Sequence, residues 1–256
     1  MFNTKKHLFF LLFLSSLSLL VGTTYAWVTS KDEHINRFSS PEAKIKISIE
    51  GKKNPLFLMP GQVNDRNIAV QNNSEQPVFV RVSLKEVLAS FYIDVEDKVG
   101  NGNIKDYSGV TPQVNPSIKK EDISTWKEDD YFQVGNKIIK MKKVESYSYQ
   151  TGIRSEYMKS VKANMPNVAD KLDVNKSDYW LYENGYYYYS ERLLPNDLSS
   201  VFMGTVIVDK NLPNSLKGSL YHQDYLAEGV LASDIAFDAW QLPMDSPVRE
   251  LLNKQL

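Results

Sequence analysis

A strict two-residue alternation of apolar and polar side chains constrains the fold of this chain more than any other feature. A β-strand presents successive side chains to opposite faces, so alternation predicts a strand with one face in the core. Residues 78–85 place Val78, Val80, Val82 and Leu84 on one face and Phe79, Arg81, Ser83 and Lys85 on the other. Residues 44–50 repeat the pattern, with Ile45, Ile47 and Ile49 on the apolar face.

A turn and a loop delimit these first strands. Pro60-Gly61 is typical of a turn, and the segment from Val63 to Val70 predicts a strand with a bulge or register change around residues 64–66. The polar residues 72–77 predict a loop. Three strands joined by short turns, with no crossover helix between them, favour an antiparallel sheet.

The second half of the chain predicts a hairpin, a strand with two apolar faces and a last long strand, in residues 180–189, 199–209 and 219–232. The hairpin turns at Asn184-Gly185, the dipeptide most typical of a two-residue β-turn. The strand with two apolar faces is expected to be central and covered on both sides. Ser246 before Pro247 predicts the start of a short C-terminal helix.

Residues 90–177 lack this regularity and are expected to form an insertion between core strands. Residues 100–119 predict a surface loop, residues 131–142 a hairpin that turns at Gly135-Asn136, and residues 155–164 a helix. The predicted fold is therefore mainly β: an antiparallel β-sandwich of jelly-roll type, with a loop and helix insertion and a short C-terminal helix.

The first 26 residues have the pattern of a secretory signal peptide. Two lysines precede an apolar run from Leu8 to Val21, and small residues follow as far as Ala26. A membrane anchor is the alternative, but the run is shorter than the roughly 20 residues that a bilayer-spanning helix needs. We expect cleavage between Ala26 and Trp27, secretion to the cell surface or extracellular matrix, and a single domain over residues 27–256.

The exported chain is nearly neutral and free of cysteine. Removal of residues 1–26 leaves 28 basic and 31 acidic residues, a formal charge of −3. So small a charge gives no reason to expect nucleic acid or a membrane surface as a partner. About 230 residues bury an adequate core without disulfides.

Few residues suit catalysis or metal binding. His7 lies in the signal peptide, and the remaining histidines, His34 and His222, form no motif such as His-Glu-x-x-His and are interpreted as surface residues. No Gly-x-Ser-x-Gly elbow or thiol nucleophile is present. Acidic residues 94–97 and 128–130 match no calcium loop and are interpreted as solvated turns. We predict no catalytic, cofactor-binding or metal-binding residues.

The aromatic residues between 179 and 189 allow two interpretations. Exposed rings form platforms on which sugars stack, whereas rings on paired strands pack against one another across a sheet. We favour packing in the core.

Four segments together resemble the TasA/camelysin group of Gram-positive exported proteins, which the dedicated signal peptidase SipW processes. They are Gly22 to Phe38 around the cleavage site, Pro60 to Val82 through the Asn-rich loop, Trp180 to Pro195 with the tyrosine hairpin, and Leu226 to Trp240. The long insertion and the tyrosine hairpin are most similar to the BsaA-type biofilm matrix proteins of clostridia. Two departures are Gly229, where the family usually repeats an alanine-acid pattern, and residues 52–58, which lack its usual tryptophan.

The resemblance implies an extracellular structural protein that polymerises into fibres of the biofilm matrix. It implies a jelly-roll β-sandwich with no cofactor and no enzymatic activity. The implied partners are further copies of this chain in a head-to-tail homopolymer, SipW during export, and a related minor matrix subunit. Two alternatives stay open, a camelysin-like extracellular metallopeptidase and a surface adhesin that binds glycan.

Residues 27–43 are expected to serve as an assembly segment. This polar stretch carries isolated apolar residues at Trp27, Val28, Ile35 and Phe38. An open sandwich leaves sheet edges unpaired, and a segment released by processing is able to pair with the edge of the next subunit, as in donor-strand complementation. Such a head-to-tail contact does not close on itself and gives filaments. A flexible leader is the alternative.

Overall fold

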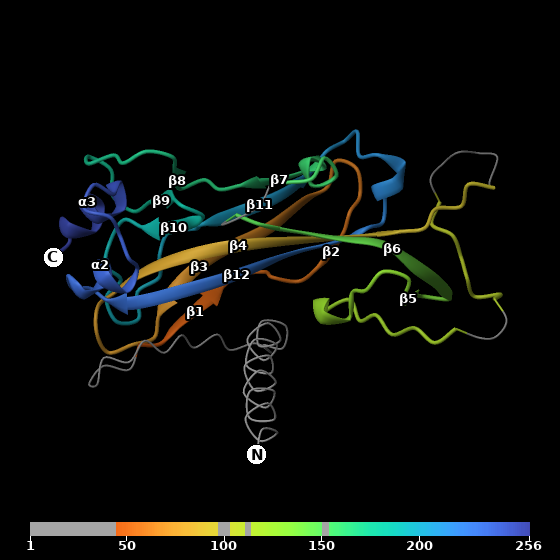
Figure 1. The fold of residues 1–256 in the computed structure, drawn as a ribbon, viewed down its shortest axis with the longest axis horizontal. Coiled ribbons are helices and arrows are strands. Elements are labelled where there is room, and N and C mark those ends of the chain that lie inside the picture. Colours follow the sequence, from red (N-terminus) through yellow and green to blue (C-terminus); the bar gives the residue numbers. More distant parts are fainter. Residues whose placement is uncertain (1–44, 97–102, 111–113, 150–153) are drawn as a thin grey trace, which may run out of the picture. The chain divides into compact units, whose positions relative to one another are not determined.

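The computed structural model describes residues 45–96, 103–110, 114–149 and 154–256, all within the unit formed by residues 35–256. They form two facing β-sheets (Figure 1), so the predicted β-sandwich is confirmed. The smaller sheet has the strand order β1 (Ile47–Glu50), β3 (Val63–Asn72), β11 (Met203–Val208) and β7 (Val161–Asn164).

The larger sheet contains eight strands. Six lie in the order β2 (Leu56–Phe57), β12 (Leu220–Leu231), β4 (Val78–Phe91), β10 (Tyr186–Tyr189), β9 (Trp180–Glu183) and β8 (Val168–Ala169). The hairpin of β5 (Tyr131–Val134) and β6 (Lys137–Ser148) completes it, because β6 pairs with β4 beside β10. All of these strand pairs are antiparallel except β8 with β9.

The alternation in the sequence corresponds to burial between the sheets. The inward residues of β4 pack with those of β1 and β3 in one apolar cluster, which includes Ile45, Ile47, Ile68, Val70, Val78, Val80, Val82 and Leu84. The predicted strands at residues 44–50 and 78–85 are therefore confirmed, although β1 begins only at Ile47 and β4 continues to Phe91. Gly229 of β12 allows β1 to approach closely, since a Cβ there would lie 3.2 Å from Ile47 Cγ2.

The predicted bulge is present in β3. Met203 of β11 pairs with Ile68, and Thr205 pairs with Asp65, so β3 contains one more residue than β11 over this interval. The extra residue falls at Arg66 and Asn67, and Asn67 has a φ of +50°. Bulges re-aim side chains and often lie next to functional sites, and this one lies where Arg66 enters the interior.

Two predicted turns have the conformation that their sequences require. Asn184 and Gly185, between β9 and β10, have φ angles of +50° and +84°, as a primed two-residue turn needs. The β5–β6 hairpin turns at residues 135–136, as predicted. Its second strand extends to Ser148 and joins the larger sheet, so part of the region 90–177 lies within the sandwich.

Two local predictions were wrong. Residues 155–164 form only a 3₁₀ turn, η2 (Met158–Ser160), followed by β7, because pairing of residues 161–164 with β11 satisfies the backbone in place of helical bonds. β11 is internal to the smaller sheet, but its outer face is not fully covered, since Ile207 is 37% exposed.

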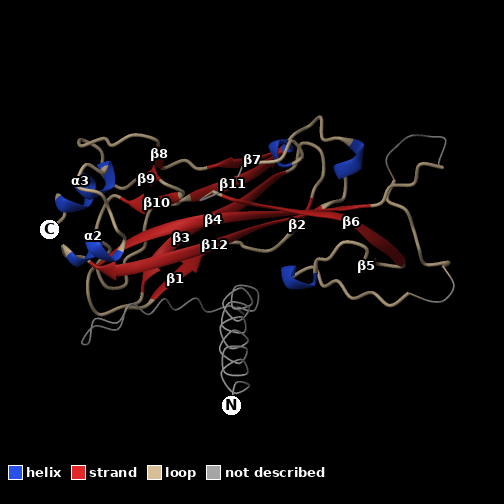
Figure 2. Cartoon of the chain, in the orientation of Figure 1, coloured by secondary structure: helices blue, strands red, loops and turns tan. Residues whose placement is uncertain are grey.

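The outer face of the larger sheet is covered at its two ends (Figure 2). At one end α2 (Ile235–Ala239), which the sequence did not predict, and α3 (Pro247–Asn253) pack over Phe79. The α3 cap is confirmed, because Ser246 Oγ accepts a hydrogen bond from the Arg249 amide at 3.2 Å. At the other end the β5–β6 hairpin and the segment around η1 (Ile123–Thr125) cover the sheet, and η3 (Asn214–Leu216) precedes β12.

None of the helices in the described part of the chain has the length and apolar character that crossing a membrane requires.

Candidate functional site: a buried polar belt

A layer of polar side chains interrupts the apolar interior between the two sheets. On β4, Glu86 lies on the inner face between Leu84 and Leu88, which belong to two different apolar clusters. Gln223 of β12 pairs directly with Glu86, and Arg66 of β3 contributes from the smaller sheet. We call Arg66, Glu86, Arg154 and Gln223 the polar belt.

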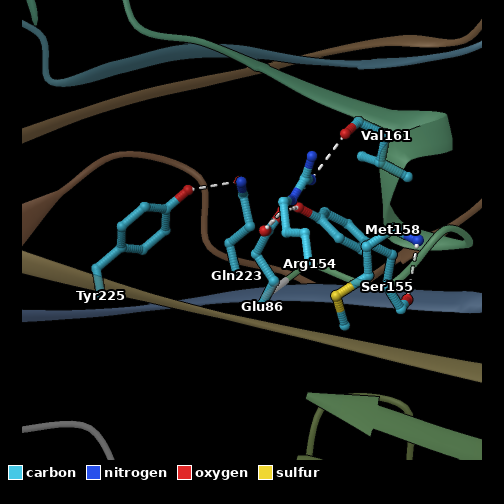
Figure 3. A network of polar contacts seen from close by, with 8 residues as sticks. Glu86, Arg154, Ser155, Met158, Val161, Gln223 and Tyr225 are labelled. Atoms are coloured by element: carbon cyan, nitrogen blue, oxygen red, sulfur yellow. Dashed lines mark hydrogen bonds and ion pairs between the residues drawn. The ribbon is translucent and has the colours of Figure 1, made fainter. Parts of the chain in front are cut away.

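Glu86 is fully buried and fully engaged (Figure 3). Arg154 donates through Nε to Glu86 Oε2 and through Nη2 to Glu86 Oε1, each at 2.7 Å. The Tyr221 hydroxyl also donates to Glu86 Oε1. A two-pronged pair of this kind is the strongest arrangement that an arginine makes with a carboxylate. The carboxylate is therefore neutralised by a rigid set of three donors.

Arg154 also joins the two sheets. Its Nη2 donates to the carbonyl of Val161 on β7 at 2.8 Å, so one guanidinium connects the smaller sheet to Glu86 of the larger one. Burial by itself lowers the pKa of Arg154, but the hydrogen bond and charge of Glu86 outweigh it, and the net effect raises the pKa. Arg154 therefore stays charged at any pH at which the protein folds.

Tyrosines enclose the pair. Burial first, and the Glu86 charge second, raise the pKa values of Tyr149 and Tyr221 well above the ordinary tyrosine value. The rings of Tyr147 and Tyr149 lie 4.9 Å apart, edge to face, and Tyr149 contacts Tyr187 of β10 at 6.2 Å. These rings lie near the point where the partner of β4 changes from β6 to β10.

Unlike Arg154, Arg66 is buried without a carboxylate partner in the described part of the chain. Its side chain is 2% exposed, and Nη1 donates to the backbone carbonyls of Lys52, at 3.1 Å, and Asn54, at 2.7 Å. Its Nε and Nη2 have no acceptor among the described residues. Burial lowers the pKa of Arg66, and the weaker effects of Tyr225 and Tyr221 oppose it. No carboxylate of the described residues pairs with this guanidinium.

The loop after β1 is shaped to hold Arg66. Gly51 has a φ of +118°, and a Cβ there would lie 2.7 Å from the Arg66 carbonyl oxygen and 2.6 Å from that of Asn67. The next amide, of Lys52, donates to the same Arg66 carbonyl at 2.8 Å. Only glycine permits this close approach at this φ. The loop and β3 together line a depression of about 540 Å³.

Gln223 carries a further donor without an acceptor. The Tyr225 hydroxyl donates to Gln223 Oε1 at 2.7 Å, whereas Gln223 Nε2 has no partner among the described residues. The side chain is 1% exposed. Buried amide groups are normally paired, so this half-satisfied amide belongs with Arg66 as a feature that needs an explanation.

The chemistry that the belt permits is limited. A general acid or base has to reach its substrate, and Glu86 is 0% exposed with both carboxylate oxygens already bonded. We interpret Glu86 and Arg154 as a structural connection between the sheets. Arg66 differs, because it has donors to offer and lies against a depression.

The residues that the sequence singled out near the N-terminus lie outside the described residues. These are Ala26 and Trp27 at the cleavage site, the assembly residues Val28, Ile35 and Phe38, and His34. His222 is described, and the interpretation of it as a surface residue was wrong. It is half-buried next to the Trp126 ring, 6.5 Å between centroids, and burial lowers its pKa.

The structure describes the acidic residues 128–130 and the aromatic tract 179–189 in full, and residues 94–96 of the first acidic cluster. In the second acidic cluster Asp129 pairs with Lys140 at 2.7 Å. Among the described residues no three His, Asp or Glu side chains gather as metal ligands would. In the aromatic tract Tyr179, Trp180, Tyr187, Tyr188 and Tyr189 are at most 5% exposed, which confirms packing in the core.

Sequence reasoning missed all four members of the polar belt. The signal for Glu86 was available, because it continues the inward alternation of Val82 and Leu84. Arg66 lies at the edge of the predicted bulge, where alternation no longer decides which side chain points inward. Arg154 lies in a segment without periodicity, and no local pattern indicates its role.

The fold and the belt define a β-sandwich with a charged layer across its core. Comparisons of the chain with family models, with curated proteins and with solved structures find no match.

Proposed function

We propose that this chain is an extracellular structural protein that polymerises into fibres of a biofilm matrix. The observation that carries the proposal is a long unpaired strand edge. β4 pairs with one side of β12 along its full length, but on the other side β2 pairs only with Leu220 and Tyr221. Among the described strands nothing pairs with that side from His222 to Leu231. Such an edge is a ready template for a strand from another chain.

The position of this edge supports assembly through the N-terminal segment. β1 lies next to β12 at Gly229 and is the first described strand after residues 27–43. In the proposed fibre, residues 27–43 of one subunit pair with the β12 edge of the next, and Trp27, Val28, Ile35 or Phe38 fills an apolar site there. Cleavage after Ala26 by a SipW-type peptidase releases this segment only after export, so assembly is confined to the outside of the cell.

The resemblance to the TasA/camelysin group and the absence of cysteine from the sequence support the same proposal. The proposal also includes jelly-roll topology for the sandwich and a related minor matrix subunit as a partner. Assembly through strand edges needs no disulfide, cofactor or metal.

Electron microscopy of purified protein tests the proposal. Protein that begins at Trp27 should form fibres, and protein that lacks residues 27–38 should remain a folded β-rich monomer that does not join wild-type fibres. A matched control replaces residues 27–38 with a Gly/Ser segment of equal length, which keeps the chain length and removes the apolar anchors. It should also remain monomeric. Fibres of normal length from either variant would show that assembly uses another surface.

The same preparation separates the alternatives. Chelator-sensitive cleavage of casein that disappears in His34→Ala or His222→Ala would favour the metallopeptidase. Binding of the monomer to a glycan array, with no fibres at any concentration, would favour the adhesin.

A further inference from the structure

Within the described chain Arg66 has two unpaired hydrogen-bond donors, Nε and Nη2, and Arg154 shows what the same two atoms bind when they are paired. The Nε–H and one Nη2–H of a guanidinium point in parallel and match the two oxygens of a carboxylate. In Arg154 these two groups bind Glu86, with two bonds of 2.7 Å. In Arg66 the same two nitrogens are buried and have no acceptor among the described residues.

A second unused donor lies beside it. Asn64 precedes Arg66 by two residues in β3 and lines the same depression, and two residues of extended chain place their Cα atoms about 7 Å apart at most. Asn64 Oδ1 accepts from Gln62 Nε2 at 2.9 Å, which fixes the amide so that Nδ2 is the free end. Asn64 Nδ2 is buried and has no acceptor among the described residues. All the unsatisfied atoms of these two residues are donors.

The surroundings have the charge that an anion requires. Asn64 and Arg66 both line the depression of about 540 Å³, together with Lys52 and Lys53. Asp65 is the one acidic residue among those lining it, and its side chain is exposed. The Arg66 guanidinium is held in place by the carbonyls of Lys52 and Asn54, so it is positioned before any ligand arrives.

We propose that Arg66 and Asn64 bind a carboxylate group at the depression between β3 and the loop of residues 51–56. The carboxylate accepts from Nε and Nη2 of Arg66 and from the Asn64 amide, and it compensates a buried positive charge that is otherwise unpaired. Two sources have this chemistry, a free small carboxylate ion and an acidic side chain from another copy of this chain. The inference does not depend on fibre formation.

Thermal unfolding in sodium formate or acetate, compared with sodium chloride at equal ionic strength, tests the free ion. The wild-type chain should show a saturable rise in Tm, because a ligand that binds only the folded state stabilises it in proportion to its occupancy. Arg66→Gln should lose the rise. Arg192→Gln removes the same charge from an exposed position and should keep it. Saturation-transfer NMR with ¹³C-acetate checks binding directly.

Asn64→Asp is the second variant and does not depend on the loss of an arginine. It supplies a carboxylate two residues from Arg66 and acts as an internal ligand. In chloride its Tm should exceed that of the wild type, and formate should raise it no further. A formate response in Asn64→Asp as large as that of the wild type would contradict the site.

A synthetic peptide of residues 27–43 distinguishes the sources, since it contains Asp32, Glu33 and Glu42. Binding of this peptide, lost on Arg66→Gln and lost when all three acids are replaced by amides, assigns the carboxylate to a second copy of the chain. If neither the ions nor the peptide produces an Arg66-dependent effect, water satisfies these donors and the proposal is wrong.

Discussion

Two arginines, Arg66 and the partly buried Arg154, extend into the interior of this sandwich, and they differ in what faces them. Arg154 uses its Nε and Nη2 to bind Glu86 and makes a further bond to Val161 of the other sheet. Arg66 is more deeply buried, yet it bonds only two loop carbonyls and leaves Nε and Nη2 without acceptors among the described residues. A buried charge is tolerated when it is paired and is costly when it is not.

Burial alone therefore does not identify a structural arginine. A completed pair such as Arg154 with Glu86 connects the two sheets and has no unbonded carboxylate oxygen to offer a ligand. A buried arginine without a carboxylate partner among the described residues, such as Arg66, is expected to lower the stability of the protein when no ligand is bound. Substitutions that remove one or both partners measure this difference directly.

The largest effect is expected at the completed pair. Glu86→Ala leaves the partly buried Arg154 without its carboxylate and should lower the free energy of unfolding by about 3–5 kcal/mol. Urea denaturation measures the change. The matched control is the double variant Glu86→Gln with Arg154→Met, which removes both charges and should recover most of the loss. A double variant as unstable as Glu86→Ala would show that packing, and not the unpaired charge, sets the cost.

The next effect is expected at the loop that holds Arg66. Gly51→Ala places a Cβ within 2.6–2.7 Å of two carbonyl oxygens at a φ of +118°. Backbone strain of this kind should lower the free energy of unfolding, measured in urea, by roughly 1–3 kcal/mol. Gly135→Ala is the control, because Gly135 also has a positive φ, +59°, but a Cβ there would meet no atom within 4 Å. Equal losses at the two sites would mean that φ alone matters and that the close approach to Arg66 does not.

A smaller effect on stability is expected from removing the charge of Arg66. Arg66→Met removes two bonds to loop carbonyls and also removes an uncompensated buried charge, so stability in chloride should stay within about 1 kcal/mol of the wild type. Arg154→Met, in contrast, isolates Glu86 and should match the loss in Glu86→Ala. Chemical denaturation of the two methionine variants side by side gives the answer. A loss at Arg66 as large as that at Arg154 would mean that the two arginines are equivalent.

Most of the fold could be predicted because the main strands have local sequence patterns. Alternation in β1 and β4 and the Asn184-Gly185 turn depend only on neighbouring residues. The prediction for residues 155–164 failed because helical spacing was weighed without the pairing of β7 to β11, which is a contact between distant parts of the chain. β6 continues beyond the predicted hairpin for the same reason, since β4 supplies its partner.

The polar belt was less predictable because its members bond to residues that are far away in the sequence. Extending the alternation of β4 past Lys85 places Glu86 inside the sandwich, but nothing nearby in the sequence indicates Arg154, 68 residues away. For Arg66 the bulge was predicted and its consequence was not, because a bulge changes the direction of the side chains that follow. The incomplete bonding of Arg66 is visible only when every neighbour is placed.

His222 is a half-buried basic group, and it differs from both arginines because it loses its charge within the ordinary pH range. Burial lowers its pKa, with Arg66 acting in the same direction and Asp224 and Glu121 opposing. Above the ordinary histidine pKa of about 6.5 the ring is neutral in both states and contributes no pH dependence. As the pH falls below that value the unfolded chain takes up a proton that the folded chain resists, so stability falls until the pH passes the folded pKa.

The smallest effect is therefore expected from removing this titration. The loss of stability that His222 causes is at most about 1.4 kcal/mol for each unit by which its pKa is lowered. We expect the free energy of unfolding, measured in urea at a series of pH values, to fall less between pH 7 and pH 5 in His222→Gln than in the wild type. Parallel slopes for the two proteins over this range would show that His222 titrates alike in both states, and that its burial next to Trp126 has no electrostatic cost.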